Sequence, residues 1–222
     1  MYETMYMKPK ADKSKEFNDA LAAHNKKFHA EGASKVFIRY VVNGPHAGEY
    51  VWVMGPTTWT DLDNRPDDKA HTEDWNKVMP LLEEVSEVEY WRMSDELSYF
   101  PEGYKGSSKI HVRSWDVKPG KWDETEAILK QVMEVYKDTK DKNPWMVYTN
   151  QFQTGNGRDI SAVVGFEKWA EFDEESTWVK DFERVHGEGS WDMAMEFMRE
   201  NTTMTEEVRE LVPELGGTST QR

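Results

Sequence analysis

The stretches VWVMGPTTWTDLD (Val51 to Asp63) and SAVVGFEKWAEFD (Ser161 to Asp173) carry one pattern at one spacing. Their matching pairs stand 110 positions apart, and they are Val53/Val163, Gly55/Gly165, Trp59/Trp169 and Asp63/Asp173. The same offset joins Lys8-Pro9 to Lys118-Pro119. Self-similarity at a fixed period indicates a repeated structural unit. The sequence therefore predicts a fold built from two copies of one unit.

Within each copy the apolar periodicity changes in the order strand, helix, strand, strand, helix, strand. In the first copy we expect strands at 2–7, 36–42, 49–55 and 87–93, with helices at 13–30 and from Thr72 onward. In the second copy we expect strands at 110–117, 145–152, 160–165 and 208–212, one helix carrying Ile128, Val132 and Val135, and two helices around Trp178 and Trp191. The stripes Trp75, Val78, Met79, Leu82 and Trp191, Ala194, Met195, Met198 have helical spacing. Pro80 lies within the first stripe and is expected to kink that helix or to mark a break in it.

The order βαββαβ is that of the ferredoxin-like unit, whose sheet has helices on one face only. Because a bare apolar sheet face must be buried, two such units are predicted to stack sheet on sheet. The expected fold class is α+β, with tandem ferredoxin-like units forming an α/β barrel. We expect the first repeat at 1–105, the second at 106–216 and a flexible tail at 217–222.

Composition excludes several classes of protein. The net charge of −14 leaves no sustained basic face, so we expect no nucleic-acid partner. The absence of cysteine excludes disulfides, thiolate nucleophiles and cysteine metal sites. Mean hydropathy is −0.85, and the sequence has no apolar run long enough to predict a membrane-spanning helix. The start MYETMYMKPK is unlike a leader, so we expect a soluble protein, cytoplasmic unless a leader was removed.

The stretch HVRSWDVKPGKWDE (His111 to Glu124) resembles the first strand and turn of dimeric α/β-barrel proteins, the group that includes the antibiotic-biosynthesis monooxygenase and NIPSNAP families. The first copy keeps the Lys-Pro pair but has Lys10 in place of the glycine. The resemblance in architecture covers essentially the whole chain. It implies either cofactor-independent oxygenase chemistry, haem handling, another barrel activity or no activity, since one fold hosts many functions.

Side chains alternate along a strand, so His111, Arg113 and Trp115 share one face and Ile110 and Val112 the other. We expect the aliphatic pair to meet the helices and the polar set to line the barrel. His111 is then a candidate catalytic base and Arg113 a candidate stabiliser of negative charge, with Trp115 as a pocket wall. The alternatives are an edge position that faces solvent, or an Arg113 that pairs with one of the many carboxylates.

Further candidates for ligand binding are polar or aromatic residues on predicted strands and on the first helix: Trp52, Tyr148, Asn150, Arg39 and His24. Core packing alone also explains the aromatic members, and a lone histidine on an apolar stripe, such as His24, is more often a partly buried structural residue. Trp115 completes this set.

The six histidines are dispersed in the sequence, and no motif for a metal or cofactor occurs, so the sequence predicts neither. The first hypothesis is a barrel that binds a small aromatic or apolar ligand without catalysis. The second is a cofactor-independent monooxygenase-like enzyme with its site in the second repeat. The third is haem handling, with His111 or His24 as axial ligand. Both a monomer with an internal pseudo-dimer and a homodimer fit the duplication.

Overall fold

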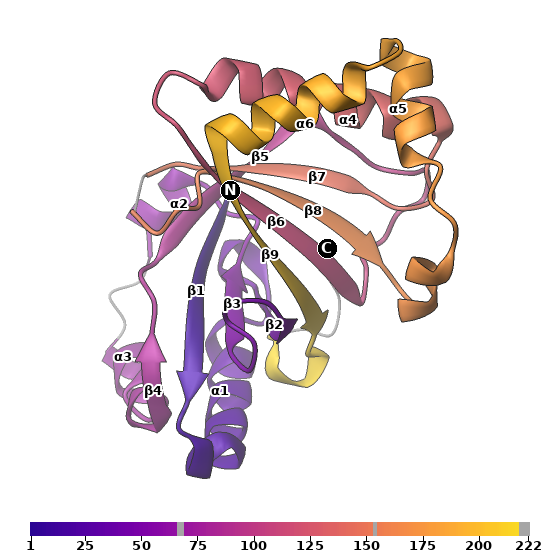
Figure 1. The fold of residues 1–222 in the computed structure, drawn as a ribbon. Helices are drawn as coiled ribbons and strands as arrows, with labels where there is room; N and C mark the ends of the chain where they lie inside the picture. The colour runs from indigo at the N-terminus through magenta and orange to yellow at the C-terminus, as the bar shows by residue number, and fades with distance from the viewer. Residues whose placement is uncertain (66–68, 153–154, 218–222) are drawn as a thin grey trace. The chain divides into compact units, whose positions relative to one another are not determined.

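The structure is a computed structural model that describes residues 1–65, 69–152 and 155–217. Its α-helices are α1 (Ser14–Phe28), α2 (Trp59–Asp63), α3 (Lys69–Trp75), α4 (Trp122–Thr139), α5 (Trp178–His186) and α6 (Ser190–Asn201). Its strands are β1 (Tyr2–Pro9), β2 (Val36–Asn43), β3 (Tyr50–Met54), β4 (Leu82–Val85), β5 (Glu89–Tyr99), β6 (Lys109–Val117), β7 (Trp145–Asn150), β8 (Ile160–Phe166) and β9 (Thr202–Leu211). Short 3₁₀ turns connect several of them (Figure 1).

The strands are hydrogen-bonded in the order β3-β2-β9-β6-β8-β7-β5-β1-β4, and β1 also pairs with β3. That additional pairing closes the order into a β-barrel. The element order β1-α1-β2-β3-α3-β5 is repeated as β6-α4-β7-β8-α5/α6-β9, with β4 added in the first half. The predicted fold class, α+β with two βαββαβ units forming an α/β barrel, is confirmed. That the halves arose by duplication stays a prediction.

The chain forms two compact units, one of residues 1–91 and 209–222 and one of residues 92–208. Their limits fall inside strands, because β5 and β9 each begin in one unit and end in the other. The repeat boundaries expected at 105/106 and 216/217 therefore stay a prediction about the sequence repeats. Of the expected tail, Gly217 donates its backbone N–H to Val36, and 218–222 lie outside the described residues.

The first unit buries α1 against one face of its strands. Phe17 and Leu21 of α1 are fully buried and pack with Val36, Ile38 and other residues of β1, β2 and β3. The opposite strand face carries a separate apolar cluster of Tyr6, Val41, Val51 and Val53. Side chains of β3 alternate between the two clusters. Tyr50, Trp52 and Met54 face the helix, and Val51 and Val53 lie on the opposite face.

In the second unit, α4, α5 and α6 pack on Trp115 and Val117 of β6 and on the neighbouring strands β7 and β8. Ile110 and Val112 lie on the other face, with Met146 and Val163. Alternation along β6 is as predicted, but the faces are reversed: Trp115 packs against the helices, whereas Ile110 and Val112 lie on the other face. The reason is that Trp115 fills the space between the strands and the helices, where Phe182 and Leu129 contact the same cluster.

In the first unit the helix that carries Trp75 ends before Pro80, where the sequence predicted a kink or a break. α3 ends at Trp75, and Val78 precedes a 3₁₀ turn at Met79–Leu81 that contains Pro80. Leu82 begins β4 instead of ending a helix. Proline has no N–H to donate and its ring disfavours the preceding helical turn, which explains the early end. The matching stripe of the second unit is helical throughout, and its Ala194 and Met198 are buried in α6.

Among the described residues, no helix combines the length and the apolar character needed to cross a bilayer.

Candidate functional site

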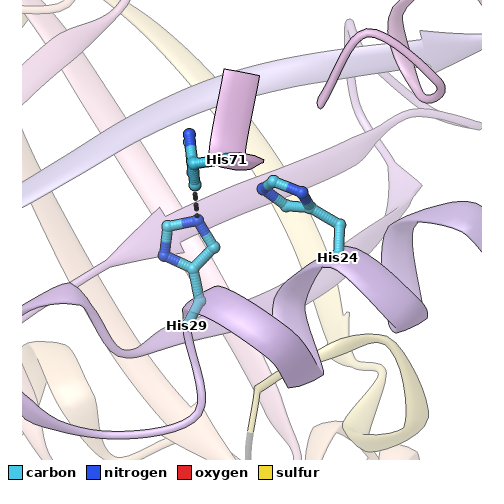
Figure 2. A group of neighbouring side chains, drawn as sticks. All are labelled: His24, His29 and His71. Carbon is cyan, nitrogen blue, oxygen red and sulfur yellow. Dashed lines mark hydrogen bonds between the residues drawn. The ribbon is translucent and has the colours of Figure 1, made fainter. Parts of the chain in front are cut away.

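The first unit brings three histidines together. His24 lies in the last turns of α1, His29 directly follows that helix, and His71 lies on α3. One nitrogen of each ring lies within 4.8 Å of the others, and Figure 2 shows the rings from α1 converging on the ring from α3. This is a candidate metal centre, which we call the three-histidine cluster.

The end of α1 explains how His24 and His29 share one site. Five positions apart on an ideal helix, two side chains would point about 140° away from each other. His29, however, has left helical geometry with φ −130° and ψ 26°. Its ring therefore turns to the same side as His24, and the ring centroids are 5.2 Å apart.

The ring of His24 is held by a carboxylate. Its Nδ1 lies 3.2 Å from Oδ2 of Asp74, and Oδ1 of Asp74 accepts a hydrogen bond from Lys77 Nζ at 2.7 Å. The bond from Lys77 lowers the pKa of Asp74, so the carboxylate is ionised and only accepts. Nδ1 of a neutral His24 must then carry the proton, which leaves a lone pair on Nε2. That Nε2 atom is buried, and among the described residues it has no hydrogen-bond partner.

The ring of His29 is held by the backbone in the same way. Its Nδ1 lies 2.8 Å from the carbonyl oxygen of Ser34, which can only accept. Nδ1 therefore donates, and the lone pair of Nε2 faces Nε2 of His71 at 3.2 Å, the contact dashed in Figure 2. Two of the three rings thus present a lone pair to the middle of the cluster.

The surroundings keep these imidazoles neutral. Burial lowers the pKa of His24, outweighing the bond to Asp74, and lowers the pKa of His29 to about 4. The rings of Phe28 and Trp75 lie 5.2 and 4.9 Å from that of His24, and Trp52 lies 5.4 Å from His29. Neutral imidazole is the form that binds metals, so the two rings are in their ligand state near neutral pH.

The spacing of His29 and His71 suits a tetrahedral metal. Zn–N distances of about 2.0–2.1 Å place two nitrogens of one tetrahedral site about 3.3 Å apart. The two Nε2 atoms of His29 and His71 are 3.2 Å apart. Hydrogen bonds from the opposite ring nitrogen to a carboxylate or a carbonyl are typical of metal-binding histidines, because they fix the tautomer and orient the ring. His24 has such a contact with the carboxylate of Asp74, and His29 has one with the carbonyl of Ser34.

In the second unit, the predicted residues His111 and Arg113 meet at Glu206 of β9. Oε1 of Glu206 lies 3.3 Å from Nε2 of His111 and accepts from Nε of Arg113 at 2.7 Å. Burial, and then the charge of Arg113, lowers the pKa of His111. Burial raises the pKa of Glu206, but the bond and charge of Arg113 outweigh it and leave that pKa lowered. Arg113 thus pairs with a carboxylate, as one of the sequence alternatives had it.

Trp115 shares this face but is only 6% exposed and belongs to the core beneath α4. Tyr148 is half-buried beside Met146 on the opposite face, and Asn150 donates its side-chain amide to the carbonyl of Arg158. Arg39 is buried on β2 of the first unit. These four side chains stay predictions as ligand contacts, because they lie on different faces or in different units.

Of the sequence candidates, His24 and Trp52 both adjoin His29, with ring centroids 5.2 and 5.4 Å from that of His29. Trp52 Nε1 donates to Oδ1 of Asn25 at 3.3 Å, and Asn25 Nδ2 donates to the carbonyl of Leu215 at 2.7 Å. This buried pair packs beneath His29. Sequence reasoning missed His71 and Asp74 as partners of His24. Their i, i+3 spacing, which puts both on one face of α3, was the signal that could have found them.

Comparisons with known proteins concern the fold. No protein-family model matches the sequence, and no curated protein gives a match. An anthrone oxidase-like protein is similar in structure, with TM-score 0.62 and 8% identity over 95% of this chain and 90% of its own. A chlorite dismutase from Candidatus Nitrospira defluvii has TM-score 0.57 and 13% identity, over 96% and 91%. A candidate monooxygenase from Lactobacillus acidophilus NCFM has TM-score 0.55 and 10% identity, over 99% and 96%. These likenesses show the shared α/β-barrel fold.

Proposed function

We propose that the protein binds one divalent transition-metal ion through Nε2 of His24, His29 and His71. The observation that carries this proposal is the buried Nε2 of His24, which is without a partner among the described residues while its Nδ1 is bonded to Asp74. Leaving a buried polar atom unpaired is unfavourable by about 1–3 kcal/mol. A metal ion in the middle of the cluster would satisfy this atom and the lone pair of His29 at once.

The donor set indicates the class of metal. Imidazole nitrogen suits zinc, copper, nickel, cobalt and iron, whereas calcium and magnesium prefer oxygen ligands. Asp74 is the carboxylate beside the cluster, and its two oxygens are already engaged by His24 and Lys77. We therefore propose a borderline metal such as zinc, with three protein ligands.

A porphyrin fits this place poorly. A haem iron bound at Nε2 of His24 would bring a wide planar ring to where the rings of His29 and His71 lie, 5.2 and 4.8 Å from His24. His111, the other candidate axial ligand, has its Nε2 against Glu206. Haem handling thus draws no support from the geometry of either histidine.

Titration of metal-free protein with zinc in a calorimeter tests the proposal. We expect one zinc per chain, confirmed by elemental analysis after dialysis. His71→Gln should abolish this stoichiometric binding, and because His71 is the partly exposed member, the variant should still fold. His46→Gln is the matched control, since His46 lies in the β2–β3 hairpin, with its ring centroid 4.2 Å from that of Tyr6. Equal zinc binding by wild type and His71→Gln would overturn the proposal.

A second candidate function is proton abstraction from a small aromatic substrate at His111, and the contact with Glu206 favours it. A neutral, half-buried imidazole oriented by a carboxylate and next to an arginine is a usual general-base arrangement. The anthrone oxidase-like neighbour and the candidate monooxygenase suggest oxygenation of an activated carbon acid as the reaction class.

Oxygen consumption with anthrone as the probe tests this second candidate. If His111 is the base, His111→Ala should slow the reaction roughly 10²–10⁴-fold, and His186→Ala should not, although His186 is also half-buried in this unit. Equal rates in wild type and His111→Ala would remove His111 from the chemistry. The small-ligand hypothesis without catalysis would then be examined by binding of the same compound.

A further inference from the structure

Two cations act on the three-histidine cluster, although the chain as a whole carries a net charge of −14. Lys27 opposes protonation of His24, and Arg65 opposes protonation of His29, through their charges. Two carboxylates offset two of the nearby cations: Asp74 pairs with Lys77, and Glu3 pairs with Arg65. Lys27 is the further cation whose charge acts on His24.

The ring of Phe28 contacts both Lys27 and His71, which places Lys27 close to the cluster. Its Nζ lies 4.5 Å from the centroid of Phe28, which in turn lies 5.0 Å from the centroid of His71. The ammonium is therefore within about 9.5 Å of the His71 ring, the sum of the two distances, which is close to a Debye length at physiological salt. Lys27 also lowers the pKa of Asp74, after the larger effect of Lys77.

A metal ion in this cluster would have three imidazole ligands and keep its full charge, because imidazole binds as a neutral donor. Tetrahedral sites with three protein ligands leave the fourth position to an external ligand. Asp74 is not free to take that position while it holds His24 and Lys77. A doubly charged ion beside Lys27 favours a negatively charged occupant over a neutral one.

We propose, resting on the metal site proposed above, that the fourth position binds a small oxyanion with a carboxylate-like oxygen donor. His24 and His29 are buried and form the closed side of the site, whereas His71 is partly exposed and Lys27 is exposed. The anion therefore approaches from the His71 side, past the Lys27 ammonium. The ligand class is a small carboxylate or inorganic oxyanion, which bonds the metal directly and is attracted by Lys27.

Cobalt-loaded protein provides the test, because the visible absorption of cobalt(II) changes with coordination number and ligand. Cobalt is added to metal-free protein, and the spectrum is followed as sodium acetate or inorganic phosphate is titrated in. Sodium perchlorate, a very weak ligand, controls for ionic strength. We expect a saturable spectral change with acetate or phosphate and none with perchlorate. Tighter binding of acetate would identify a carboxylate as the preferred ligand, and tighter binding of phosphate an inorganic oxyanion.

Two charge variants of α1 test the role of Lys27. Lys27→Gln should weaken anion binding roughly two- to fivefold, as expected for an exposed charge, without changing cobalt affinity to the same extent. Lys26→Gln removes the same charge from the adjacent exposed position and should leave anion binding unchanged.

The outcomes separate the two proposals. No stoichiometric cobalt binding overturns the metal site itself. Stoichiometric cobalt binding with a spectrum that acetate and phosphate leave unchanged overturns the anion site and keeps the metal site. A spectral change that Lys27→Gln and Lys26→Gln affect equally overturns the assignment of Lys27.

Discussion

His24 Nδ1 lies 3.2 Å from Oδ2 of Asp74, which links α1 to α3 across 50 residues of sequence. This contact decides the chemistry of the three-histidine cluster, because it fixes the proton on Nδ1 and leaves Nε2 as a donor atom. The bond of Lys77 to the other oxygen of Asp74 holds the carboxylate in place. Asp74 is therefore a positioning residue, which acts on a metal ion through His24.

Asp74→Asn is predicted to weaken zinc affinity by roughly 10- to 100-fold, the effect typical of removing a partner of a metal-binding histidine. Asparagine keeps the shape and one acceptor oxygen but removes the charge that raises the basicity of the ring. Competition with a chromogenic chelator measures the affinity. Glu73→Gln is the control, since Glu73 is exposed on the same helix and pairs with Lys69. A similar loss in both variants would mean that the effect is general charge and not the contact with His24.

Zinc is predicted to stabilise the fold. A ligand that binds only the native state at about 1,000 times its Kd contributes about 4 kcal/mol, so Tm should rise by several degrees. Differential scanning calorimetry with zinc, and with zinc followed by a chelator, measures the effect and its reversal. In His71→Gln the Tm should be the same with and without zinc. A zinc-dependent shift that persists in this variant would place the ion elsewhere.

Local periodicity was sufficient to predict most of the fold. Helix α4 and strands β6 and β8 follow the alternation and the 3.6-residue stripe because each buries one apolar face. The exception near Trp75 arises because an apolar stripe continues past the point at which Pro80 stops the helix. Which face of β6 meets the helices was not decided by alternation, since both faces carry apolar side chains, Trp115 on one and Val112 on the other.

The cluster was harder to predict, because it depends on tertiary packing. His24 was correctly placed on the buried stripe of α1, but its partners come from α3 and from the chain beyond the helix end. His29 reaches the site because the backbone leaves helical geometry at this residue, and no pattern in the sequence predicts that change. Glu206 beside His111 likewise depends on β9 beginning at Thr202, whereas the sequence indicated a strand only at 208–212.

Acidification is predicted to destabilise the second unit through His111. Burial and Arg113 lower its pKa below the ordinary value of 6.5, so the unfolded chain takes up the proton first. Stability therefore rises with pH through this range and is lost as pH falls from about 6.5 toward the lower pKa of the folded state. Tm measured between about pH 7.5 and pH 5 should fall less in His111→Asn than in wild type. Parallel curves for the two proteins would contradict a lowered pKa.

Phe182→Ala is predicted to destabilise the protein by about 3–5 kcal/mol, the range for deleting a fully buried aromatic ring. Phe182 is 0% exposed, and its ring lies 4.8 Å from that of His186 and 5.3 Å from that of Trp191, so its loss leaves a cavity beneath α5 and α6. Phe172→Ala is the control, because Phe172 is 58% exposed and water already reaches most of its ring. That variant should change stability by less than about 1 kcal/mol. Urea unfolding followed by circular dichroism gives both values, and equal losses would show that Phe182 does not lie in the core of the second unit.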